Sequence, residues 1–197
     1  MPLVARLRPK PFAGLANLAR GTLLLAFLGV VGPRWSLEAQ NGPSGEYHVK
    51  AAFLYNFAKF VEWPPEAFPN PTSPITLCIL SEEGFQSVLE QTLIGKTAQG
   101  RSLVVRRWGT SLQDALQCHI VFVSFAKRGA IGDLLRATKG MSVLTVGEID
   151  GFAQRGGMVN FVILENKIRF EVNDLSAKTS GLRISARLLQ LAVNVWE

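Results

Sequence analysis

Residues 156–196 constrain the fold most, because their apolar residues recur with the period of a β-hairpin. In residues 158–164, Val159, Phe161 and Ile163 point to one face of the expected strand. After a turn near Asn166, apolar residues recur at every second position of residues 168–172, with Arg169 and Glu171 between them. Side chains of a strand alternate between its two faces, so a period of two predicts strands with one apolar face. The pattern indicates an antiparallel hairpin that two short helical segments follow.

The chain before this hairpin alternates short apolar runs with segments of helical pattern. The expected strands are residues 75–80, 103–108, 119–125 and 143–146, and the expected helices are residues 46–61, 83–93, 112–116 and 130–137. Continuous apolar runs are typical of parallel strands that are covered on both faces. We therefore predict an α/β fold with an open, mostly parallel, doubly wound sheet that is flanked by helices and carries the C-terminal antiparallel hairpin at its edge.

The first 39 residues are predicted to form a signal peptide. Basic residues precede an apolar run at residues 22–31, and this run of about ten residues is too short to span a bilayer. Cleavage after Ala39 fits the pattern, and an uncleaved anchor is the alternative. Residues 40–45 then form a linker and residues 46–197 form one domain without a membrane span. We expect this mature part in the periplasm, with secretion to the exterior as the alternative.

The charge of the mature part argues against a nucleic-acid partner. The full sequence holds 21 basic and 15 acidic residues, but five of the basic residues and one of the acidic residues lie in the first 39. The remaining 16 basic and 14 acidic residues nearly balance, and no basic run interleaved with aromatic residues occurs among them.

The chain offers few groups for catalysis or metal binding. Its two histidines, His48 and His119, are each interpreted as structural residues, and none of the common nucleotide, hydrolase or zinc motifs occurs. We therefore expect no enzyme activity, no cofactor and no metal site.

Three arginines near the C-terminus are the candidate ligand site. Arg169, Arg183 and Arg187 come close together if the hairpin packs beside the last helix. Guanidinium groups bind carboxylate or phosphate through paired hydrogen bonds, so the three could hold a small anion. The alternative is a solvated face on which they pair with Glu165 and Glu171.

Cys78 and Cys118 are the two cysteines of the chain. In an oxidising compartment an even pair is a disulfide candidate, and closing a loop of about 40 residues stabilises a fold by roughly 4 kcal/mol in the chain-entropy model. The alternative is two small buried side chains that never meet.

Several landmarks of the sequence together resemble the YfiR family of periplasmic regulators. They are KAAFLYNFAKFVEWP at residues 50–64, the strand at residues 75–80, CHIVFVS at residues 118–124, GGMVNFVILENKIRFEVN at residues 156–173, GLRIS at residues 181–185 and LLQLA at residues 188–192. Their order and spacing make the resemblance specific, and it runs from about residue 47 to residue 195, nearly the whole mature part.

The resemblance implies a dimeric, non-enzymatic domain that acts by protein contact. In its best known member the family holds an inner-membrane diguanylate cyclase inactive by binding its periplasmic domain, which lowers cyclic di-GMP and disfavours biofilm. Cys78 and Cys118 look like the matching pair of a family disulfide, whereas a second family disulfide has no counterpart in residues 148–161. Other relatives accompany sensor kinases, so the alternative is a small-molecule, anion-binding sensor that partners a sensor histidine kinase.

The contact surface is expected around the hairpin. Phe152, Ile163 and Phe170 are predicted to form an apolar partner-binding patch, and the three arginines are predicted to tune the contact electrostatically. The alternative is that the two phenylalanines fill the core.

Overall fold

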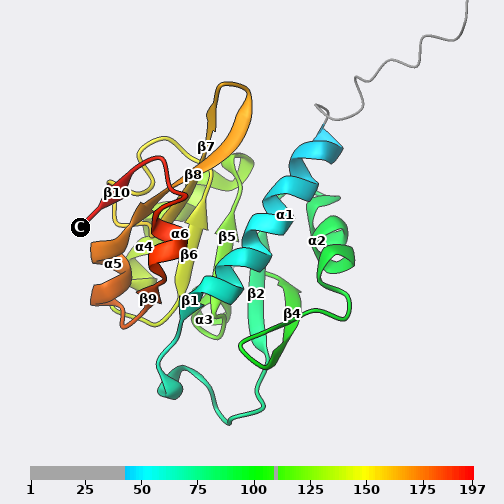
Figure 1. The fold of residues 1–197 in the computed structure, drawn as a ribbon, viewed down its shortest axis with the longest axis vertical. Coiled ribbons are helices and arrows are strands. Elements are labelled where there is room, and N and C mark those ends of the chain that lie inside the picture. The colour runs from blue at the N-terminus through cyan, green and yellow to red at the C-terminus, as the bar shows by residue number, and fades with distance from the viewer. Residues whose placement is uncertain (1–42, 109–110) are drawn as a thin grey trace, which may run out of the picture. The chain divides into compact units, whose positions relative to one another are not determined.

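A computed structural model describes residues 43–108 and 111–197, in which helices flank one large sheet (Figure 1). The predicted signal peptide lies outside the described residues. The first helix, α1 (Pro43–Phe60), begins three residues before the expected start at Glu46 and so includes the last three residues of the segment expected to be a linker. Proline is favoured at the first position of a helix because its fixed φ suits the helical backbone, so a Pro/Gly/Ser stretch does not exclude a helix start.

The elements follow the predicted alternation, with bounds that differ by a few residues. The remaining helices are α2 (Phe85–Leu93), α3 (Leu112–Leu116), α4 (Ile131–Thr138), α5 (Asp174–Thr179) and α6 (Ala186–Leu189), with short 3-10 segments at η2 (Pro65–Ala67) and η3 (Phe125–Ala130). The strands are β1 (Val61–Glu62), β2 (Ile75–Leu80), β3 (Thr97–Ala98), β4 (Arg101–Arg107), β5 (Ile120–Val123), β6 (Leu144–Gly147), β7 (Val159–Leu164), β8 (Lys167–Asn173), β9 (Arg183–Ile184) and β10 (Val195–Trp196). Within the described residues, every helix is too short or too polar to cross a bilayer.

The large sheet has the strand order β10-β8-β7-β6-β5-β2-β4-β3. Strands β4, β2, β5, β6 and β7 run parallel, and β8 returns antiparallel to β7. The predicted α/β fold is therefore confirmed. One detail differs, because the two-residue strand β10 pairs with β8 and lies outside the hairpin as the last strand of the sheet.

The turn of the hairpin explains its register. Glu165 and Asn166 both have positive φ angles, of 50° and 57°, and they connect the directly paired residues Leu164 and Lys167. Two consecutive residues of this conformation form the two-residue turn whose twist matches that of antiparallel strands. Asparagine tolerates this conformation better than most residues, which is why the sequence signals the turn here.

The face of the sheet under α1, α2 and α6 holds the larger core, which is rich in aromatic residues. The ring of Phe57 on α1 lies 5.8 Å from that of Phe161 and 5.3 Å from that of Phe170, measured between centroids. Phe161 and Phe170 are directly paired across the hairpin. The apolar alternation of the hairpin thus serves to pack its inner side under α1.

The opposite face, under α3 and α4, holds a smaller core that contains a disulfide between Cys78 on β2 and Cys118 just before β5. Their Cα atoms are 5.9 Å apart, and the predicted bridge is confirmed. The two cysteines are 40 residues apart in the chain and lie at neighbouring strands. The disulfide therefore holds the smaller core together covalently, in addition to its apolar packing.

Candidate functional site

A groove between α1 and the β7–β8 hairpin is the candidate functional site. Figure 1 shows the hairpin extending past the rest of the sheet beside the N-terminal half of α1. The groove consists of two adjoining hollows of about 400 and 360 Å³, which share Glu46, Ile163 and Ile168 as lining residues. Phe125 and Glu148, which follow β5 and β6, line the larger hollow, so the groove lies at the carboxyl ends of the parallel strands. Open α/β sheets generally bind their ligands at this end.

The end of β7 gives the groove an apolar wall. Ile163 is 72% exposed and lines both hollows, whereas the next residue, Leu164, is exposed on the opposite face of the hairpin. These residues pair with β8 but lie beyond the pairing of β7 with β6, so no neighbouring strand or helix covers them. Val49 on α1 is exposed on the opposite wall. Exposed apolar side chains gathered in one place are typical of a contact surface.

A charged network forms the floor of the larger hollow. The Lys50 side chain is 10% exposed and donates hydrogen bonds to the carboxylates of Glu46 and Glu148. Glu148 also accepts a hydrogen bond of 2.9 Å from the backbone N–H of Phe125. Burial lowers the pKa of Lys50, but the hydrogen bonds to Glu148 and then Glu46 outweigh it, so the pKa of Lys50 is raised. Lys50 therefore stays charged and ties α1 to the ends of β5 and β6.

This network fills the position where a doubly wound sheet usually receives a ligand. The ammonium group of Lys50 stands between two carboxylates of the protein itself, Glu46 on the same helix and Glu148, which the backbone N–H of Phe125 also holds. A buried ion pair of this kind is stable only while its partners remain in place, because an unpaired buried charge is costly. The arrangement fixes the floor of the groove, above which the apolar walls are accessible together with the exposed carboxylates of Glu46 and Asp150.

Phe152 does not lie on the surface as expected; it is fully buried in the smaller core. Its ring packs against Gly147 and Gly157, and a Cβ added at Gly157 would lie 2.2 Å from the ring. Two glycines without side chains thus make room for the ring inside the fold. The prediction that Phe152 binds a partner is wrong for this reason.

Phe170 is also buried, with 1% of its surface exposed. It faces α1, where the rings of Phe53 and Phe57 lie 5.4 and 5.3 Å away. The alternative interpretation, that this residue fills the core, is the one that the structure supports. Of the three predicted patch residues, Ile163 alone is at the surface, and its role in partner binding stays a prediction.

The three arginines do not share one surface. Arg183 on β9 lies 3.6 Å from Glu62, measured between Nε and Oε2, and the guanidinium of Arg187 lies 5.4 Å from the ring centre of Phe60. Both are therefore near the C-terminal end of α1. Arg169 is next to Phe170 on β8, so its side chain points to the opposite face of the sheet. The expected three-arginine anion site is not formed.

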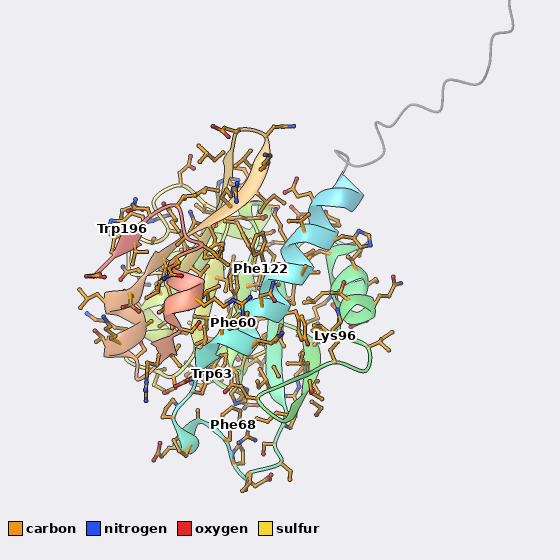
Figure 2. The ribbon with its side chains drawn as sticks, viewed as in Figure 1. Phe60, Trp63, Phe68, Lys96, Phe122 and Trp196 are labelled. Atoms are coloured by element: carbon orange, nitrogen blue, oxygen red, sulfur yellow. A yellow bond between two sulfur atoms is a disulfide. The ribbon has the colours of Figure 1, made fainter. Side chains whose placement is uncertain are left out.

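The amino ends of the parallel strands hold a second, larger cavity of about 620 Å³. His119 on its wall accepts a hydrogen bond of 3.1 Å at Nδ1 from the N–H of Thr76, and its Nε2 lies 3.2 Å from the carbonyl oxygen of Ala67. Its ring stacks on Phe68 with centroids 4.4 Å apart, and the Arg101 guanidinium lies on Phe68 as well, 3.6 Å from the ring centre. Figure 2 shows Trp63 and Phe68 at this end of the sheet, away from the hairpin tip.

The surroundings of His119 give it a structural role. Burial lowers its pKa, and the nearby Arg101 lowers it further, although the hydrogen bond to Ala67 acts in the opposite direction. The neutral ring, with a proton on Nε2, satisfies both hydrogen bonds. The sequence-based interpretation of His119 as a structural residue fits this geometry.

A family model described as YfiR/HmsC-like matches residues 47–193. This range includes both walls of the groove, the disulfide and every strand except β10.

Two solved structures resemble this fold at low sequence identity. A conserved domain protein from Vibrio cholerae O1 biovar eltor strain N16961 has a TM-score of 0.50 and 12% identity, over 76% of this chain and 60% of that chain. A domain named ABC from Streptococcus pneumonia, solved in complex with L-Trp, has a TM-score of 0.43 and 11% identity, over 65% of this chain and 56% of its own. The chain thus covers less than two thirds of either protein, and the first match shows the fold alone.

Proposed function

The chain belongs to the YfiR/HmsC-like family, and from this premise we propose that it is a periplasmic regulator that represses a membrane diguanylate cyclase by direct contact. Binding to the periplasmic domain of the cyclase would hold the enzyme inactive and so lower cyclic di-GMP. The observation that carries this proposal is the exposed apolar groove between α1 and the hairpin. A regulator that acts by contact needs such a surface and no reactive groups.

The groove is suited to contact because it is apolar at its rim and fixed at its floor. Burying an exposed isoleucine side chain completely contributes about 1.5–3 kcal/mol to a contact. That corresponds to roughly tenfold to hundredfold in affinity. Ile163 is the most exposed residue of the apolar wall, so it is the residue from which a partner gains most.

The fixed floor reduces the cost of binding. The Lys50 network holds α1 against the ends of β5 and β6 before any partner arrives. A preformed surface loses less conformational freedom on binding than a mobile one, so more of the contact energy appears as affinity.

The alternative function, an anion sensor that partners a sensor kinase, rested on the three arginines. Arg169 points to the other face of the sheet from Arg187, so these residues cannot hold one small anion together. Contact regulation is therefore the function that the geometry favours. The homodimer implied by the resemblance stays a prediction, which sedimentation of the purified protein tests.

Replacing Ile163 by aspartate tests the proposed function. The Ile163→Asp variant places a charge on the groove wall, and we expect repression to fail, so that cyclic di-GMP rises in cells that produce the cyclase. Because Ile163 is 72% exposed, the thermal unfolding midpoint should stay near that of the wild type.

Ile94 provides a matched control, since it is 76% exposed and follows α2 rather than lining the groove. The Ile94→Asp variant should repress normally. Normal repression by a folded Ile163→Asp variant would contradict the proposal.

A further inference from the structure

The two halves of the groove differ in charge. In the larger hollow the carboxylates of Glu46, Glu148 and Asp150 face a single ammonium group, that of Lys50. The smaller hollow is mainly apolar, with Val49, Phe53 and Ile168 on its walls and Lys167 at its rim. The groove therefore has an acidic half and an apolar half.

The acidic half keeps two exposed carboxylates, those of Glu46 and Asp150. Lys50 is shared between Glu46 and Glu148, and the side chain of Glu46 is still 41% exposed. Asp150 is exposed and forms no ion pair with any described residue. Two further cations lie at the edge of this half: Arg155 donates a hydrogen bond of 3.2 Å to the backbone carbonyl of Asp150, and the Arg128 guanidinium lies 4.6 Å from the ring centre of Phe125. Both are held by other groups, so a cation that enters from outside would still meet the carboxylates of Asp150 and Glu46.

We propose that the groove receives a partner segment that carries a lysine or arginine next to apolar side chains. The cationic group would lie by Asp150 and Glu46, and the apolar side chains would cover Ile163 and Val49. This inference rests on the proposed function, in which the groove is the regulatory contact, and it defines the chemistry of the partner that fits.

Charge complementarity favours such a partner over a second copy of this chain. If two copies met groove to groove around a twofold axis, the acidic half of one copy would face either the acidic half or the mainly apolar half of the other, where Lys167 is the basic lining residue. The first arrangement brings like charges together, and the second buries carboxylates against an apolar wall, so both match the acidic half less well than a basic segment does. A basic and apolar segment has the opposite effect, because it gains from both halves.

A library of random peptides displayed on phage tests the proposal with a defined probe. Peptides are selected on the purified wild-type protein and then depleted on the Ile163→Asp variant, so that only groove-dependent sequences remain. We expect these sequences to combine lysine or arginine with leucine, isoleucine or phenylalanine. The affinity of the best synthetic peptides should fall about fivefold to tenfold in the Asp150→Lys variant, in which attraction turns into repulsion.

The Glu83→Lys variant is the control, because it makes the same change of charge at an exposed position that does not line the groove. It should leave peptide affinity unchanged. Groove-dependent peptides that are acidic or purely apolar would overturn the inference, as would the absence of any groove-dependent peptide. Dimers of the wild type that dissociate on Ile163→Asp substitution would also overturn it, since the groove would then hold a second copy.

These outcomes are separable from those of the proposed function. If basic peptides bind the groove but Ile163→Asp leaves repression intact, the inference stands and the regulatory role of the groove fails. If Ile163→Asp abolishes repression but the selected peptides lack a cation, the regulatory role stands and the inference fails.

Discussion

The two ends of the sheet are fixed by buried polar side chains of opposite character. At the carboxyl end, the charged Lys50 bridges Glu46 and Glu148 and holds α1 in place. At the amino end, the neutral His119 joins the start of β2 to η2 through Thr76 and Ala67. Each residue ties a covering segment to the sheet, one by charge and the other by neutral hydrogen bonds and stacking.

This difference gives the two ends opposite responses to pH. The pKa of Lys50 is raised above 10.5, so its contribution to stability is complete below that pH and is lost as the pH rises through the folded-state pKa. The pKa of His119 is lowered below 6.5, so the unfolded chain binds a proton more readily than the folded chain, and stability falls as the pH drops below 6.5. Alkali therefore weakens the carboxyl end, and acid weakens the amino end.

Loss of the disulfide should have the largest effect, and it acts on the side of the amino end. The Cys78→Ala/Cys118→Ala double variant removes a bridge across 40 residues, and we expect a loss of about 4 kcal/mol in the free energy of unfolding. Urea denaturation monitored by tryptophan fluorescence measures it. Wild-type protein treated with a reductant should show a similar loss. A loss below about 1 kcal/mol would mean that packing alone closes the smaller core.

The next largest effect is expected from Lys50→Ala at the carboxyl end. The substitution leaves Glu148, which is 15% exposed, without its cation. Removing one partner of a fully buried pair costs about 3–5 kcal/mol, and with Glu148 partly exposed we expect about 2–3 kcal/mol. Lys59→Ala is the control at an exposed position of the same helix; its ammonium lies 5.4 Å from the ring centres of Tyr55 and Phe60, so it should cost less than about 1 kcal/mol. Equal effects of the two substitutions would show that the network does not anchor α1.

The fold could be predicted from the sequence because its signals are local. Alternating apolar residues and a turn at Asn166 define the hairpin, and continuous apolar runs define the parallel strands. The two-residue strand β10 was not predictable, since its pairing with β8 depends on where the chain returns after α6. Pairing over such a short stretch leaves no periodic pattern.

The site was harder to predict, because it depends on contacts between distant segments. Phe152 follows a glycine in an irregular segment, which suggested exposure, but the space for its ring comes from Gly147 and Gly157. The period of two on β8 did predict that the side chains of Arg169 and Phe170 point to opposite faces of the sheet. The same pattern could have shown that Arg169 does not lie on the face of the sheet that carries Arg187. Pattern analysis at a single residue was thus less reliable than the same analysis applied along a strand.

The Lys50 network was missed altogether. A signal was present, since Lys50 is followed by the apolar residues Ala51 and Ala52 and precedes Phe53 and Leu54 on α1. A lysine beside an apolar stretch of a helix needs either solvent or a carboxylate partner. The partner Glu148 is 98 residues away in the sequence, so the chain alone could not identify it.

The smallest of these effects is expected at His119, and it sharpens the contrast between the two ends. Between pH 7.5 and pH 4.5 the wild type should lose stability that a His119→Gln variant does not lose, because glutamine at this position takes up no proton in either state. Carboxylates elsewhere titrate in the same range but do so equally in both proteins, so the difference between the two unfolding free energies isolates His119.

Two neighbouring groups influence the pKa of His119. The charge of Arg101 disfavours a second cation, and the hydrogen bond to the carbonyl of Ala67 partly offsets this. A glutamine that restores one of the two hydrogen bonds keeps the variant folded at neutral pH, where urea titration gives the reference value. Parallel pH curves for the two proteins would mean that the amino end accommodates a charged ring, and the contrast with the Lys50 end would then be one of geometry alone.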